Sequence, residues 1–236
     1  MVRLNKTKFF CIAILFYTGF LTSCAPKDYI VFISTPYGKM DAILYDQTPE
    51  HKKIFLHQIR KDVFENYQFY KIIKDFMVVA GNPQPYQITS STLVEKCPEE
   101  SEALIEYDTS LFHKKGMLGA FKSNRSGKST VGCEFYIVEG RKFSEEELNF
   151  IENNTNTKIP LYHRKIYKEI GGIPYLDQDY IIFGEIIRGL EIIPQLTKLE
   201  TNDFGKPTKP IPITFKSKKI RKSKITKEYH FIYPTQ

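Results

Sequence analysis

The sequence lacks the motifs of several common enzyme classes. Its four cysteines and five histidines form no C-x-x-C pair and no Cys/His cluster, so nothing indicates a metal site. No serine lies in a nucleophile-elbow pattern, and residues 125–129, which read RSGKS, do not have the spacing of a phosphate-binding loop. Internal repeats are also absent. We therefore expect no cofactor and no metal.

The composition is that of a globular protein. Hydrophobic residues make up 42% of the 236 residues and charged residues 26%, which argues against wholesale disorder and suits one large domain or two small ones. The formal net charge is +7, and much of the excess lies in residues 215–227, FKSKKIRKSKITK. This segment fits a solvated basic tail, a contact with anionic lipid headgroups or a contact with nucleic acid. No recognition motif supports nucleic acid.

The amino terminus has the pattern of an export signal. Arg3, Lys6 and Lys8 precede an apolar stretch over residues 9–21, which has the length of a signal-peptide core and is short for a membrane span. The following Leu-Thr-Ser-Cys sequence, ending at Cys24, resembles the lipobox of bacterial lipoproteins. The alternative is a plain cleaved signal peptide. We expect a signal peptide over residues 1–23 and a lipidated tether over residues 24–28.

The resemblance to the lipobox implies that Cys24 carries diacylglycerol and that several acyl chains anchor the protein, since one chain binds only marginally. This places the protein on a membrane of the bacterial cell envelope. The outer membrane is favoured because Ala25, and not aspartate, follows the cysteine. Cys97 and Cys133 would then lie in a compartment where disulfides persist, and they are either two buried thiols or a pair.

Short strands separated by turns dominate the remaining chain. A hydroxyl at Thr48, a proline and an acid predict a helix start, and Ser144 with Glu147 matches a capping box. We expect strands at residues 29–34, 39–44, 69–73, 76–80, 116–121, 135–138, 180–187 and 211–215, and helices at residues 49–61, from 144 to about 155 and at 190–199. Residues 83–108 are expected to be irregular. The count predicts a mainly β fold, a closed eight-stranded antiparallel barrel capped by two or three helices.

Four blocks of sequence, in order, resemble the cyclophilin-type peptidyl-prolyl cis/trans isomerases. They are TPYGKMDAILYDQTP at residues 35–49, FYKIIKDFMVVAGNP at 69–83, HKKGMLGAF with CEFYIV between 113 and 138, and GGIPYLDQDYIIFGEIIRGLEII at 171–193. The resemblance covers roughly residues 29–220, which implies one cyclophilin-like domain followed by a basic carboxyl-terminal tail over residues 221–236. The helix near Ser144 is similar to one in bacterial lipoprotein members of the family.

The resemblance implies an enzyme that rotates X-Pro peptide bonds in polypeptide substrates, without cofactor, metal or nucleic acid. Unaided, this rotation faces a barrier of about 18–20 kcal/mol. A hydrophobic slot holds the proline ring, and a cationic donor hydrogen-bonds the prolyl nitrogen as amide resonance is lost. Here we call the slot the four apolar positions implied by the family: Phe76, Met77, Tyr136 and Leu176.

Lys71 stands where the family has its catalytic arginine, and it keeps the charge without the planar fork of donors. Val79 replaces a glutamine that holds the substrate backbone, and Phe121 is bulkier than the family's alanine. The implied substrate-binding positions are Phe76, Met77, Val79, Phe121, Lys122, Glu134, Tyr136, Tyr175, Leu176 and Tyr180.

These departures predict a working fold with weakened catalysis, which acts in the folding of envelope proteins. The alternative is a cyclophilin-fold chaperone or binding module that grips proline segments with little turnover. Without the block matches, the slot residues would be read as core and Lys71 as a surface lysine. His51, His57 and His113 have no partner at triad or metal spacing, so we expect them to be structural or exposed.

Overall fold

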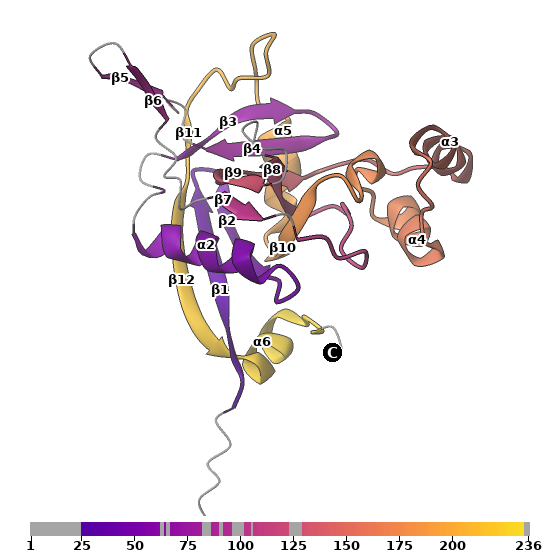
Figure 1. Ribbon diagram of the computed structural model, residues 1–236, viewed down its shortest axis with the longest axis horizontal. Helices are drawn as coiled ribbons and strands as arrows, with labels where there is room; N and C mark the ends of the chain where they lie inside the picture. Colours follow the sequence, from indigo (N-terminus) through magenta and orange to yellow (C-terminus); the bar gives the residue numbers. More distant parts are fainter. Residues whose placement is uncertain are drawn as a thin grey trace, which may run out of the picture.

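The computed structural model describes residues 25–61, 64, 67–81, 86–89, 92–95, 102–104, 106–122 and 129–233, with the backbone alone at 86–104, 122 and 129–133. Cys24, Cys97 and the signal-peptide segment lie outside these residues. The described chain is mainly β, a curled antiparallel sheet with short helices packed around it (Figure 1).

Nine strands follow one another across the main sheet in the order β11-β3-β4-β9-β8-β10-β2-β1-β12. Their bounds are β1 Lys27–Thr35, β2 Gly38–Leu44, β3 Gln68–Ile73, β4 Met77–Gly81, β8 Met117–Lys122, β9 Ser129–Val138, β10 Ile181–Arg188, β11 Ile211–Pro212 and β12 Thr214–Arg221. A short strand, β7 (Glu102–Leu104), pairs with β9 beside this path. The expected antiparallel β architecture is therefore confirmed.

The two ends of the sheet are linked by one stretch of chain. β11 pairs with β3, while β12, which follows after a single residue, pairs with β1 over eight positions. At the junction the Ile213 amide donates to the carbonyl of Tyr67 at 2.9 Å. The sheet thus curls into a half-barrel, and a closed barrel of eight strands stays a prediction.

The central strands are buried on both sides, with side chains that alternate between two clusters. On β4, Val78 and Ala80 face the barrel interior, whereas Met77 and Val79 belong to a second cluster on the outer face. β9 repeats this pattern, with Phe135 and Ile137 inside. Because successive side chains of a strand point to opposite faces, this alternation assigns each residue to the core or to the outer surface.

Helix α2 (Pro49–Arg60) covers the interior with Phe55, Leu56 and Ile59. Pro49 at the first position agrees with the sequence, but the expected hydroxyl cap at Thr48 is wrong, because its side chain makes no capping hydrogen bond. The carboxylate of Glu106 instead accepts from the backbone amides of Glu50 and His51 at 3.1 and 3.2 Å. A distant acid therefore satisfies the helix terminus.

Two helices form an appendage to one side of the sheet (Figure 1): α3 (Glu145–Thr155) and α4 (Leu161–Glu169). The predicted capping box is confirmed, since the Glu147 amide donates to the Ser144 hydroxyl and the Ser144 amide to the Glu147 carboxylate. The sequence did not predict α4. The appendage has its own core, which includes Leu148, Phe112 and Tyr167.

The carboxyl-terminal part of the chain is more ordered than the sequence suggested. The expected helix at 190–199 is a short 3-10 turn, η3 (Leu190–Ile192), followed by α5 (Ile193–Thr197). The basic segment treated as a tail continues from β12 into helix α6 (Lys222–Tyr229), whose Ile225 is fully buried against Ile30 and Ile43. Burial of Ile225, together with the packing of Ile220, Tyr229, Phe231 and Tyr233 on the same cluster, holds this lysine-rich segment against the sheet.

Within the segment expected to be irregular, the structure contains a hairpin of β5 (Tyr86–Thr89) and β6 (Thr92–Glu95), which extends away from the main sheet (Figure 1). Among the described helices, none has the length and apolar character needed to cross a membrane.

The appendage makes stability depend on pH through His163. Its ring stacks on Phe112 with centroids 3.8 Å apart, and burial lowers its pKa although the carboxylate of Asp177 acts in the opposite direction. The unfolded chain therefore binds a proton first as the pH falls below about 6.5, and stability present above that pH is lost. We expect a lower free energy of unfolding at pH 5.5 than at pH 7.5, measured by urea denaturation. The change His163→Asn should reduce this difference and the exposed-site control His230→Asn should not; an unaltered difference in the first variant would contradict this.

Candidate functional site

The outer cluster of the sheet contains two of the four residues predicted to form the slot, and the other two pack against it. Met77, Val79 and Tyr136 are buried in it, while Phe76 and Leu176 pack against it half-buried. Residues far apart in sequence meet here because β4, β9 and β8 are neighbours in the sheet. The structure thus brings all four slot residues together.

Lys71 lies on the same face as the slot. Strand registers place Lys71 opposite Val79, Val79 opposite Tyr136, Tyr136 opposite Gly119 and Gly119 opposite Ile182. Directly opposed residues of antiparallel strands project to the same side, so these five positions form one row across the outer face. A register shift between Phe69 and Lys71 turns the lysine to this side.

The ammonium group of Lys71 is available as a donor. The side chain is exposed and makes no ion pair or hydrogen bond within the described residues. The backbone of the next residue is fixed, because the Ile72 amide donates to the Gly205 carbonyl at 2.7 Å. A cation with a fixed base and a free head can therefore reach a substrate on the slot.

The floor of the slot is the ring of Tyr136, which lies over Gly119. A Cβ atom at position 119 would sit 2.1 Å from Cζ of Tyr136, so only glycine leaves room for the ring. The Tyr136 side chain has no exposed area. Phe121 packs edge-on against it with ring centroids 5.1 Å apart, and a groove narrowed by Phe121 stays a prediction.

A chain of buried polar groups anchors this floor. The Tyr136 hydroxyl lies 2.8 Å from Nε2 of His113, whose Nδ1 lies 2.8 Å from Oδ1 of Asp177. The Tyr167 hydroxyl donates to the other Asp177 oxygen at 2.6 Å. With the proton assigned to Nδ1, His113 donates to the carboxylate and accepts from Tyr136. Each atom of the chain is then satisfied.

Burial favours the neutral form of Tyr136 and Tyr167, the two tyrosines in this series of hydrogen bonds. Desolvation raises the pKa of Tyr136 and of Tyr167, and the nearby Asp177 carboxylate raises both further. His113 itself is 1% exposed. Of the two roles expected for it, structural or exposed, the structure therefore supports the structural one. Its partner Asp177 is 64 residues away, and no local pattern could have revealed the pair.

The turn that carries Phe76 is held by a carboxylate that the sequence did not single out. Asp75 has φ +57°, in the left-handed region, and its amide donates to Glu139 Oε2 at 2.9 Å. The Thr197 hydroxyl donates to the other oxygen at 2.8 Å. Glu139 therefore ties the turn between β3 and β4 to helix α5, and so fixes the position of Phe76.

The other predicted rim residues lie in different surroundings. Glu134 accepts a hydrogen bond from the Tyr70 hydroxyl at 3.1 Å, and Tyr180 packs edge-on against Tyr136 at 6.4 Å. Tyr175 lies in the 3-10 turn η2 (Pro174–Leu176) and is 47% exposed. It packs against Phe143 and not against the outer cluster. Lys122 is described by its backbone alone. Proline binding by these residues stays a prediction.

In the part of the chain that the structure describes, no three His, Cys, Asp or Glu side chains gather in a way that could hold a metal ion. The groups at the site are an ammonium, an apolar floor and neutral hydroxyls. They can bind and polarise an amide, and they include no activated nucleophile.

Comparison with known proteins identifies this arrangement. Residues 30–217 match the model of the family described as cyclophilin type peptidyl-prolyl cis-trans isomerase/CLD. The chain belongs to the cyclophilin family of peptidyl-prolyl isomerases. Its sequence is 25% identical to a candidate peptidyl-prolyl cis-trans isomerase of Staphylococcus saprophyticus over 72% of this chain and 81% of that one. A similar candidate of Staphylococcus epidermidis is 24% identical over 78% and 88%.

Solved cyclophilins share the fold. A cyclophilin-type isomerase of Cryptosporidium parvum, crystallised in the presence of the dipeptide Ala-Pro, superposes with a TM-score of 0.55 and 21% sequence identity, covering 79% of this chain and 98% of that one. The resemblance stated from four sequence blocks is therefore confirmed at the level of family and fold.

Removal of the Tyr136 hydroxyl tests the anchored floor. Tyr136→Phe leaves Nε2 of His113 buried without a partner, so we expect a loss of about 1–3 kcal/mol in the free energy of unfolding, measured with urea. Tyr162→Phe is the matched control, since that ring is 66% exposed, and it should have no effect. Equal stability of Tyr136→Phe and the wild type would show that the chain of hydrogen bonds contributes nothing.

Proposed function

We propose that this cyclophilin rotates X-Pro bonds with the ammonium of Lys71 as the donor and the slot as the grip on the proline ring. The observation that carries this proposal is the row of opposed residues from Lys71 through Val79 to Tyr136, which places the cation beside the slot on one face. As the bond twists, the prolyl nitrogen regains its lone pair and accepts a hydrogen bond that the planar amide does not. A donor that binds the twisted form more strongly lowers the barrier.

We also propose that catalysis is weaker than the family's usual machinery would give. Val79 is buried and apolar where the family carries an amide, and Phe121 packs over the floor. Each missing hydrogen bond to a substrate costs about 1–3 kcal/mol, or roughly five- to 150-fold in rate. We propose as well that the ends of the curled sheet meet through β11 and β12 to make a closed eight-stranded barrel. Closure would keep these side chains in fixed register.

The second candidate function is a module that holds proline segments without turnover. It is favoured by the low exposure of the floor, since Met77, Val79 and Tyr136 are each at most 4% exposed. A bound ring would then contact mainly Phe76, Phe121 and Leu176 at the rim. Turnover, and not binding, separates the two candidates.

We propose further that the mature protein is a lipoprotein of the bacterial envelope that assists protein folding there, anchored through Cys24. Support comes from the Leu-Thr-Ser-Cys sequence and from the chain just after it: the Pro26 carbonyl accepts from the Lys222 amide at 2.8 Å, and Lys27 opposes Arg221. Pro26 and Lys27 of the proposed tether therefore lie beside the basic β12–α6 segment, whose exposed cations could meet anionic headgroups.

The activity of Lys71 is tested with a proline peptide. Lys71→Ala removes a charged donor, so we expect kcat/KM to fall about 10- to 150-fold, measured by exchange spectroscopy or a protease-coupled assay. Lys218→Ala, on β12, should leave the rate unchanged. Wild-type rates equal to the uncatalysed reaction would remove the isomerase and leave the binding module.

Restoration of the family's residues tests the cause of the weakness. The double change Lys71→Arg with Val79→Gln should raise kcat/KM, because it returns a planar donor fork and a backbone-binding amide to an intact slot. If the rate does not rise, the groove itself is closed, and Phe121→Ala should then open it.

Lipidation is tested by metabolic labelling with a palmitate analogue. We expect label on the wild-type protein and its loss, together with release from the membrane fraction, in Cys24→Ser. Cys11→Ser, which changes a cysteine within the signal peptide, should remain labelled. An unlabelled wild-type protein would leave a plain cleaved signal peptide.

A further inference from the structure

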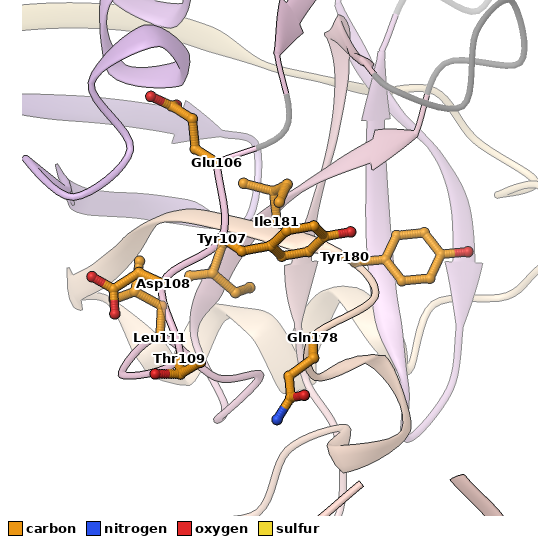
Figure 2. A pocket seen from close by; sticks show the side chains of 9 residues that line it. Glu106, Tyr107, Asp108, Thr109, Leu111, Gln178, Tyr180 and Ile181 are labelled. Atoms are coloured by element: carbon orange, nitrogen blue, oxygen red, sulfur yellow. The ribbon is translucent and has the colours of Figure 1, made fainter. Parts of the chain in front are cut away.

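A pocket of about 230 Å³ opens beside the slot, between residues 106–111 and residues 178–182, which form a turn and the start of β10 (Figure 2). Tyr107 extends from the first segment to the second, and its hydroxyl donates to the Asp179 carbonyl at 3.3 Å. The lining consists of Glu106, Tyr107, Asp108, Thr109, Leu111, Gln178, Tyr180, Ile181 and Ile182. The pocket thus combines an apolar base with two aromatic rings and two acids.

The pocket continues the face that carries the slot. Leu111, Tyr180 and Ile182 line it and also belong to, or pack against, the outer cluster. Ile182 ends the row that starts at Lys71, and the Tyr180 ring lies 6.4 Å from that of Tyr136. An extended chain covers about 3.3 Å per residue. A residue about two positions from a slot-bound proline therefore reaches the pocket.

The charge of the pocket is negative, in contrast to the net charge of +7 on the whole chain. No lysine or arginine lines it. Glu106 is already engaged, because it caps α2 and lies 2.6 Å from Nδ1 of His51. Asp108 accepts from the amide and hydroxyl of Ser110 and makes no ion pair within the described residues. Of the two carboxylates that line the pocket, Asp108 is therefore the one whose charge is available to a ligand.

We propose that this pocket binds a lysine or arginine side chain of the substrate close to its proline. The aliphatic stem packs on Leu111, Ile182 and the ring of Tyr107, and the cationic head lies near the Asp108 carboxylate. This inference rests on the proposed function, since the proline in the slot sets the position of the neighbouring residue. The bound sequence would have Lys71 on one side of the proline and the acidic pocket on the other, so the preference applies to one flank only.

The test uses peptides with Lys, Arg, Ala or Glu two residues before or two residues after the proline. Exchange spectroscopy measures kcat/KM without a coupling protease, and amide shifts on titration measure binding. On one flank we expect Lys and Arg to exceed Glu about three- to ten-fold at low salt, and less at high salt. No such flank preference would overturn the inference.

Asp108→Asn keeps the oxygen that accepts from Ser110 and removes the charge, so it should bring the Lys-to-Glu ratio close to one. The matched control Glu191→Gln neutralises an exposed carboxylate on η3 and should retain the ratio. Turnover that is flat across the series would overturn the pocket proposal alone. Binding without turnover would favour the binding module over the isomerase. The ratio of Kd values for the Glu and Lys peptides would then show whether the pocket binds a cation. Neither binding nor turnover would overturn both.

Discussion

The two-residue alternation of β4, β9 and β8 is the constraint on which the site depends. Each strand is packed on both faces where its side chains are described, and the apolar ones belong either to the interior of the half-barrel or to the outer cluster. A slip of one residue would exchange the two sets and place Val78 and Ile137 where the slot needs Met77 and Tyr136. Burial on both faces therefore fixes the register, and the register fixes the position of Lys71 relative to the slot.

Local signals in the sequence were sufficient for the elements with short-range causes. Proline at Pro49 and the Ser144–Glu147 box gave the starts of α2 and α3, and β-branched runs gave the central strands. The same reasoning failed at Thr48, because the cap came from Glu106, more than fifty residues away. It also missed α4 and α6, whose stability comes from packing of side chains such as Tyr167 and Ile225 against distant elements.

The residues of the candidate site also fall into two groups, those that the sequence indicated and those that depend on distant contacts. Family resemblance named the slot residues and Lys71, and the sheet brings them to one face. The supporting groups could not be named, because His113, Asp177 and Glu139 acquire their roles only through contacts across the fold. Tyr175 shows the converse, a residue implied by resemblance that turns toward the appendage. The substitutions at the rim change how the peptide backbone is held, whereas the buried hydrogen bonds keep the floor rigid.

The pairing of β1 has a mechanical consequence. This strand begins directly after the proposed attachment point and is flanked by β12 over eight positions and by β2 over six. Tension applied to the chain ahead of Lys27 acts along the strand, so the inter-strand hydrogen bonds, which run across it, are loaded together in shear and not broken one by one. A protein dragged by flow or by a client under load would thus resist unravelling from its tethered end.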